Sequence, residues 1–155
     1  MNLSENFTVT EFTKSQTAAR LGIDNMPTPE HLENAKKLFQ NVVQKVRDHF
    51  GATVINSGYR GAALNKAVGG ASTSQHCNGE AADIEVPGVA NYDVARWIEE
   101  NCEYDQLILE AAKKDDPAAG WVHVSYREGS NRKQSLTAVF VNGKPVYSNG
   151  LGVYE

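Results

Sequence analysis

Several features are scarce or missing in this sequence, and each absence excludes a class of protein. Only two cysteines occur, Cys77 and Cys102, too few for a disulfide scaffold. The formal net charge is −4, whereas a nucleic-acid-binding domain normally carries a basic patch. No apolar run approaches the roughly 18 residues of a membrane span. We therefore expect neither a nucleic-acid partner nor a membrane span.

The first residues also lack a targeting signal. They read MNLSENFTVTEFTKS, with neither the basic region nor the apolar region of a secretory signal peptide. We therefore expect synthesis in the cytoplasm. Any action outside the cell would then require release by another agent.

What is present is typical of one globular domain. The chain has 155 residues, of which 41% are hydrophobic and 22% charged, enough for a sizeable core. We expect a single domain over residues 1–155 and a monomer, with residues 1–27 forming an arm that packs on the body. Asn142-Gly143 between two strand-like runs predicts a C-terminal hairpin over residues 137–148.

The spacing of apolar residues predicts both helices and strands. The clearest element is an amphipathic helix over residues 29–50, which begins at Thr28-Pro29 and ends at Gly51. Asn91 is expected to cap a later helix. Helices that precede and interrupt strands able to pair antiparallel indicate an α+β fold, with an antiparallel central sheet and flanking helices. The other expected elements are helices over residues 62–68 and 92–101 and strands over 53–57, 81–86, 106–110 and 121–126.

One stretch carries a metal-binding pattern. Ser74, His76, Gly79, Ala81 and Asp83 form S-x-H-x-x-G-x-A-x-D. A neutral imidazole and a carboxylate are both good zinc ligands, and the glycine allows a sharp turn between them. The expected strand would fix the aspartate, and the preceding loop would hold the histidine. A zinc site needs a third ligand.

His123 in WVHVS is the candidate for that ligand. Strand alternation places Trp121, His123 and Ser125 on one face and valines on the other. A single histidine there would be interpreted as a buried core residue. Together with His76 and Asp83 it completes a His-Asp-His set with a position left for water, as a catalytic zinc requires. Cys77 is expected to be a free thiol, because adjacent side chains usually diverge.

A zinc hydrolase also needs a general base. Glu110 ends the QLILE strand, and it would lie beside His123 if that strand pairs with residues 121–126. The alternative for Glu110 is an exposed carboxylate at a strand end. Asp105, Asp115 and Asp116 are weaker rivals, since the first points to the other face and the others lie in a loop.

Three further residues are expected to bind substrate. Arg60 follows the first strand in a turn, and a guanidinium binds a carboxylate in a bidentate manner. Its alternative role is a structural salt bridge. Ser74 would hydrogen-bond substrate or simply cap the metal loop, and Trp121 would line the cleft or fill the core.

These segments resemble a known family. SGYR, LNKAVGG, SQHCNGEAADI, DQLILE and WVHVS are similar to the zinc D-Ala-D-Ala carboxypeptidases of the hedgehog/DD-peptidase fold, especially their small phage- and prophage-associated branch. TVTEFTKSQTAARLGIDNMP and NRKQSLTAVF extend the resemblance over most of residues 7–140. It implies zinc ligands at His76, Asp83 and His123, a substrate-anchoring Arg60 and a substrate-contacting Ser74.

The resemblance also implies hydrolysis of peptidoglycan stem peptides, after release to the bacterial cell wall. One position departs from the family pattern. Many relatives have an acidic base three residues before the second histidine, where this chain has Gly120. Glu110 is therefore the predicted base. The alternative function is a non-catalytic zinc-containing module that binds the cell wall or belongs to a virion, and a weaker one is a hydrolase of another amide.

Overall fold

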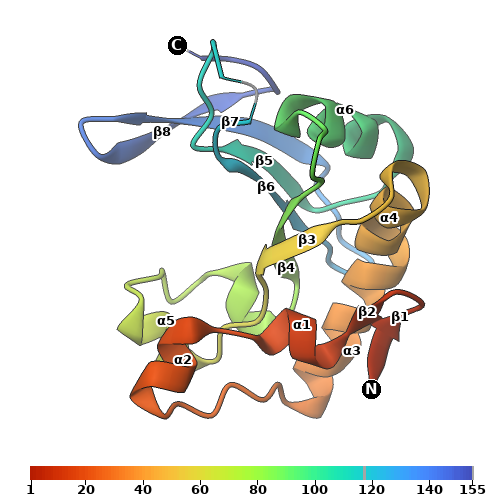
Figure 1. The fold of residues 1–155 in the computed structure, drawn as a ribbon, viewed down its shortest axis with the longest axis vertical. Helices are drawn as coiled ribbons and strands as arrows, with labels where there is room; N and C mark the ends of the chain where they lie inside the picture. The colour runs from red at the N-terminus through yellow and green to blue at the C-terminus, as the bar shows by residue number, and fades with distance from the viewer. Residues whose placement is uncertain (117, 155) are drawn as a thin grey trace.

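The centre of the molecule is a six-stranded sheet with the strand order β3-β4-β6-β5-β7-β8 (Figure 1). The structure is a computed structural model and describes residues 1–116 and 118–154. The strands are β3 (Val54–Ser57), β4 (Ala81–Glu85), β5 (Gln106–Glu110), β6 (Trp121–Ser125), β7 (Gln134–Val141) and β8 (Lys144–Asn149).

Neighbouring strands pair antiparallel, with the exception of the parallel pair β5–β7. The α+β prediction with a mostly antiparallel sheet is therefore confirmed. The parallel pair was not predicted from the sequence. It arises because β6 already occupies one edge of β5 and runs antiparallel to it. The chain reverses direction after β6, so β7 runs parallel to β5 along its other edge. The predicted hairpin is present and longer than expected, since β7 and β8 extend to both sides of residues 137–148.

Helices flank the sheet and precede it. They are α3 (Pro29–Leu38), the π-helical turn η1 (Phe39–Val43), α4 (Gln44–Phe50), α5 (Ala62–Ala67), the 3₁₀ turn η2 (Gln75–Asn78) and α6 (Asn91–Asn101). The arm contains β1 (Asn2–Ser4), β2 (Phe7–Thr8), α1 (Val9–Thr13) and α2 (Gln16–Leu21). Figure 1 shows α1 and α2 beside α5, at the opposite end of the molecule from the β7–β8 hairpin.

The long helix predicted over residues 29–50 is helical throughout but not uniform. The Thr28 side chain accepts a hydrogen bond from His31 N, and Gly51 ends the helix with a φ of 95°, as expected. Between α3 and α4 the chain widens into the π turn, where Gln44 N donates to Phe39 O. Periodicity did not reveal this turn, because a single wider turn barely alters which residues face the core.

Asn91 does not cap its helix as predicted. Ala90 is the N-cap residue of α6, and Asn91 is the first helical residue. The Asn91 side chain instead donates to the carbonyl oxygens of Ala119 and Gly120. It thereby ties the start of α6 to the segment that leads into β6.

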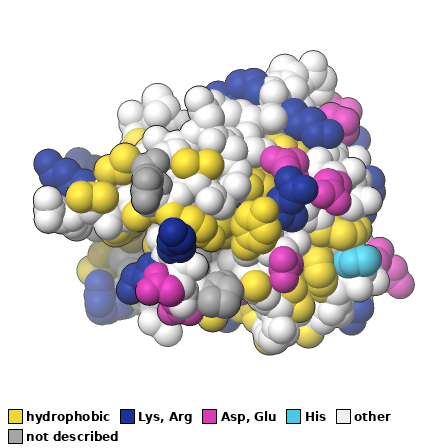
Figure 2. Space-filling model, turned by 90° about the horizontal axis from the view of Figure 1, so that it is seen from above, with side chains coloured by type: hydrophobic (Ala, Val, Ile, Leu, Met, Phe, Trp, Pro, Cys, Tyr) yellow, Lys and Arg dark blue, Asp and Glu magenta, His cyan; other side chains and the backbone are white. Residues whose placement is uncertain are grey.

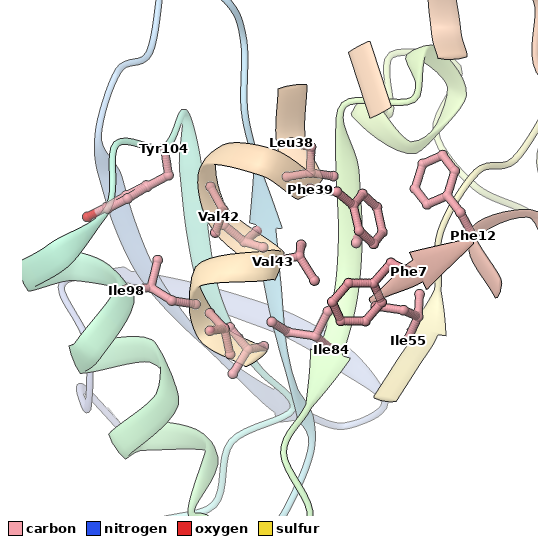
Figure 3. Packing of buried hydrophobic residues seen from close by; sticks show 14 of the residues in the cluster. Phe7, Phe12, Leu38, Phe39, Val42, Val43, Ile55, Ile84, Ile98 and Tyr104 are labelled. Carbon is pink, nitrogen blue, oxygen red and sulfur yellow. The ribbon is translucent and has the colours of Figure 1, made fainter. Parts of the chain in front are cut away.

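The main core lies between the helices and one face of the sheet. Phe7 and Phe12 from the arm pack edge-on against Phe39, with ring centroids 5.3 and 5.2 Å apart (Figure 3). Ile55 and Ile84 from the sheet are part of the same cluster. Because strand neighbours alternate between faces, burial of Ile84 and of the valines of β6 turns Asp83 and His123 toward the opposite face. The core thus determines which residues line the functional face.

The surface in Figure 2 carries Lys, Arg, Asp and Glu side chains of both signs, interspersed with hydrophobic ones. Among the described residues, no helix combines the length and apolar character that crossing a membrane demands.

Candidate metal centre

Asp83, His76 and His123 come together on the face of the sheet opposite the core. Asp83 and His123 are paired across β4 and β6. Asp83 Oδ1 lies 2.9 Å from His123 Nδ1 and 3.4 Å from His76 Nε2. One ligand atom from each residue lies within 4.8 Å of the others, so the three could hold a metal ion. The predicted triad is therefore assembled, and its two strand residues, Asp83 and His123, are 40 positions apart in the sequence.

The loop before β4 fixes His76. Its Nδ1 lies 2.7 Å from the carbonyl oxygen of Gly58, which can only accept a hydrogen bond, so Nδ1 carries the proton. The lone pair of Nε2 then faces Asp83. A hydrogen bond to the second ring nitrogen is the usual way in which proteins orient a metal-binding histidine.

Gly79 makes the turn between the two ligands possible. It ends η2 with a φ of 74°, and a Cβ at this position would overlap the backbone carbonyl of His31. A residue with a side chain would be strained by the dihedral angle and would push the metal loop away from α3. The glycine of the sequence motif therefore has the role that its spacing predicted.

The donor set fits a tetrahedral zinc ion. Two ligands at roughly 2.0–2.1 Å from such an ion lie about 3.3–3.4 Å apart. The His76–Asp83 separation of 3.4 Å meets this value. The His123–Asp83 separation of 2.9 Å is that of a direct hydrogen bond and needs only a small adjustment. Two nitrogens and one carboxylate oxygen leave one tetrahedral position open.

The electrostatics keep Asp83 ionised. Burial alone would raise the pKa of its carboxyl, but the interactions of the carboxylate with His123 and His76 outweigh burial and hold that pKa well below the usual range. The carboxylate is therefore ionised, and able to act as a ligand, at neutral pH.

The triad opens into a cavity of about 660 Å³ that also contains the predicted base. In the pairing of β5 with β6, Ile108 lies opposite His123 and Glu110 opposite Trp121. Glu110 and His123 are thus diagonal neighbours on one face, and both line the cavity. Burial raises the pKa of Glu110, and the negative charge of Asp83 raises it further, while His123 lowers it. A half-buried carboxylate with a raised pKa suits a general base.

Arg60 and Ser74 line the same cavity. Arg60 Nη2 lies 3.3 Å from Ser74 Oγ, and the same oxygen accepts a hydrogen bond from His76 N. Ser74 is therefore both the cap of η2 and a neighbour of the predicted substrate-binding group. Among the described residues Arg60 makes no ion pair, and its buried Nε has no hydrogen-bond partner. The structure thus gives no support to a salt-bridge role for Arg60.

The N-terminal arm holds the turn that carries Arg60. Phe12 O accepts a hydrogen bond from Tyr59 N. The side chain of Asn25 donates to Tyr59 O and Thr13 O and accepts from Gly61 N. A Cβ at Gly58 would overlap Phe12, so only glycine allows this approach. The arm therefore contributes to the site although none of its residues lines the cavity around the triad.

The other histidines and the rival carboxylate are engaged elsewhere. His31 contacts the Tyr59 hydroxyl and His49 stacks on Trp97. Cys77 has a free thiol, as predicted, and is not part of the metal-ligand set. Asp105 is completely buried and is bound by Arg132 and Gln75, so it is not free to act as a base.

Several residues that line the cavity were not predicted from the sequence. Tyr147 reaches it from β8, and its pKa is raised by burial and by the charge of Glu110. A basic pair in YREGSNRK, directly after β6, was the one signal in the sequence that could have identified two of the others. The unpredicted residues that line the cavity include Gln75, Gln106, Arg127, Arg132 and Tyr147.

Comparison with known proteins agrees with this site. No curated protein matches the chain. A family model described as peptidase M15 matches residues 5–125, which include β2 through β6 and all three candidate ligands. The match covers well over half of the sequence and ends at Ser125, the last residue of β6. The chain therefore belongs to the peptidase M15 family.

Proposed function

We propose that this protein is a zinc-dependent peptidase that hydrolyses peptide bonds in the stem peptides of bacterial peptidoglycan. The observation that carries the proposal is the assembly of His76, Asp83 and His123 around an open position, in one cavity with Glu110. Membership of the peptidase M15 family supports peptide hydrolysis. The resemblance of the metal motif to D-Ala-D-Ala carboxypeptidases supports the stem peptide as substrate.

The roles of the side chains follow from their positions. A zinc ion on the triad supplies Lewis acidity, which polarises a peptide carbonyl and acidifies water. Glu110 accepts a proton from the attacking water and returns it to the leaving amine nitrogen. Arg60 holds a carboxylate of the substrate or the developing oxyanion, using guanidinium nitrogens that form no ion pair with the described carboxylates. Ser74 holds that guanidinium in place, and Trp121 lines the cavity.

The proposal includes where the protein acts. We expect a monomer that works on the cell wall after release from the cytoplasm, in phage lysis or as part of a virion. This expectation rests on the resemblance to the phage-associated branch. Cleavage at the terminal D-Ala and cleavage within the stem are both compatible with the cavity.

A non-catalytic zinc module is the second candidate, and Gly120 favours it, because that position lacks the acidic residue of many relatives. The position of Glu110 favours catalysis, since it brings a half-buried carboxylate into the cavity from another strand.

The test separates these candidates. Purified protein is loaded with zinc, its metal content is measured, and it is incubated with purified peptidoglycan and with a panel of D- and L-dipeptides. We expect one bound zinc and release of D-Ala or muropeptide fragments. Glu110→Gln should keep the zinc and reduce turnover by about 10²–10⁴-fold. Zinc-loaded protein that binds the wall without any turnover would establish the non-catalytic module.

A further inference from the structure

Three arginines line the cavity, and all are attached to the turn that carries His76. They are Arg60, Arg127 and Arg132. Arg60 contacts Ser74 at the start of this turn. Arg132 is bound to Asp105, which in turn accepts a hydrogen bond from Gln75. Each guanidinium is therefore positioned by the same segment that presents the metal ligand.

Arg132 is held rigidly. Its Nε and Nη2 donate to the two carboxylate oxygens of Asp105 at 3.0 and 2.9 Å, and its backbone N donates to the same group at 3.0 Å. Asp105 is fully buried, while the Arg132 side chain remains more than half exposed. The buried carboxylate thus serves to orient an arginine whose remaining nitrogen, Nη1, lies outside this fork.

Arg127 is held in a similar way. Its Nη2 lies 3.4 Å from Glu80 Oε1, and Glu80 is nearly buried whereas Arg127 is about half exposed. The backbone of Glu80 is fixed at both ends, because its N donates to Gln75 O and its O accepts from Tyr126 N. The three guanidiniums are matched by only two partner carboxylates in the described chain. This arginine group, made of Arg60, Arg127 and Arg132 with the partners Glu80 and Asp105, therefore has an excess of positive charge.

The strand register places this group at one end of the cavity. Asp105 directly precedes β5 and Glu110 ends it, so the two lie roughly 16 Å apart along the strand. The triad lies between them, because His123 is paired with Ile108. The opposite end contains Glu110, Trp121 and Tyr147. The cavity is therefore positive toward Arg132 and acidic and aromatic at the other end.

We propose that Arg127 and Arg132 bind a second carboxylate of the substrate, on the same side of the scissile bond as the carboxylate held by Arg60. This inference rests on the proposed peptidase function and specifies its substrate class. The preferred substrate is a peptide with two carboxylates on one side of the bond that is cleaved. Asp105, which holds Arg132, precedes Ile108 by three residues, or about 10 Å along an extended strand, and Ile108 is paired with His123. This separation is the length of about three extended peptide residues.

The experiment uses a set of synthetic stem peptides in which each carboxylate in turn is converted to a carboxamide. The zinc-loaded wild type should show a raised KM for two of these amides. The rise in KM for the first amide, which replaces the carboxylate held by Arg60, should disappear when Arg60 is substituted. The rise in KM for the second amide, which replaces the second carboxylate, should be about ten- to a hundredfold, the range expected for loss of a charge-assisted hydrogen bond.

The variants identify which arginines respond to the second carboxylate. Arg127→Gln removes a half-exposed guanidinium. Asp105→Asn/Arg132→Gln removes the second one together with its buried partner, so that no buried charge is left unpaired. Both should raise KM for the acidic peptide with little change in kcat, and neither should affect the peptide that lacks the second carboxylate. Arg96→Gln is the matched control, because Arg96 pairs with Glu99 and Glu100 on α6 and does not line the cavity.

Two results would overturn the inference. One is a loss that is equal for the acidic peptide and its amide, which would show a general structural effect. The other is no loss in either variant, although both are folded and zinc-loaded. Binding of the same peptides to zinc-loaded Glu110→Gln, measured by calorimetry, provides an independent readout. If no peptide is hydrolysed but binding depends on the second carboxylate and on Arg127, the peptidase proposal fails. The assignment of Arg127 to a second carboxylate of the bound peptide then still stands.

Discussion

Gly120 lies directly against the backbone carbonyl of Glu110, so that a Cβ on Gly120 would overlap that oxygen. Gly120 also has a φ of 73°, which favours glycine. The position at which the resemblance leads us to expect an acidic base therefore has no room for a side chain in this backbone conformation. The same close approach brings the strand of Glu110 against the start of β6, and Glu110 lines the cavity from there.

The first prediction concerns this contact. Gly120→Ala should lower the free energy of unfolding by about 2–4 kcal/mol, because backbone strain adds to overlap with a backbone atom that cannot move aside. Gly120→Glu should likewise fail to supply a second base. Gly129→Ala is the matched control, since Gly129 has a φ of 82° and a Cβ there would meet no atom within 4 Å. Urea unfolding measures both, and equal losses would contradict the role of the contact.

A second prediction links Glu110 to the pH dependence of stability. In the folded protein its pKa is raised above the ordinary 4.5, so the folded state retains a proton that the unfolded state has lost. The free energy of unfolding of the metal-free wild type should therefore fall as pH rises from 4.5 through the raised pKa. Glu110→Gln cannot lose this proton. Its stability relative to wild type should rise over the same interval.

Denaturation of the metal-free proteins at pH 4 and pH 8 measures this difference. Glu5→Gln, an exposed glutamate outside the cavity, is the control. A Glu110→Gln variant that loses stability relative to wild type toward pH 8 would show that the carboxylate is stabilised by its surroundings rather than strained by burial.

A third prediction concerns metal removal. Asp83 is the ligand that both histidines contact, so Asp83→Asn should weaken zinc binding by more than about a hundredfold. In the wild type, free zinc at 100 times its Kd should stabilise the fold by about 2.7 kcal/mol, and a chelator should reverse this. Thermal unfolding with and without zinc measures both effects. Asp93→Asn on α6 should behave as wild type, and a zinc response preserved in Asp83→Asn would exclude Asp83 as a ligand.

The fourth prediction concerns the arm. Asn25 is buried and makes three hydrogen bonds that join the arm to the turn around Arg60. Asn25→Ala should cost about 2–3 kcal/mol of stability. It should also raise KM more than it lowers kcat, because Arg60 would no longer be held in position. Asn101→Ala, which removes one exposed hydrogen bond to Trp97 O, should change neither the stability nor KM. Unchanged KM in folded Asn25→Ala would show that the turn holds its shape without the arm.

The residues that could hold a metal ion were predicted from the sequence because their chemistry and spacing are local. His76, Gly79 and Asp83 lie within eight consecutive positions, and alternation along β6 turns His123 to the face opposite its valines. The fold class followed from the same short-range patterns. The strands, the long helix and the hairpin at Asn142-Gly143 each depend on apolar spacing or on turn residues, which a sequence displays directly.

What the sequence could not determine depends on register and on contacts between distant segments. Only the pairing of β5 with β6 puts Glu110 diagonal to His123, and only the tertiary structure shows that a side chain at Gly120 would overlap Glu110 O. The attachment of Arg132 through Asp105 to Gln75 joins segments that no periodicity relates. Sequence alone thus determined which atoms can bind the metal, whereas tertiary structure decided which charged groups face it, because side-chain neighbours across a sheet are set by long-range pairing.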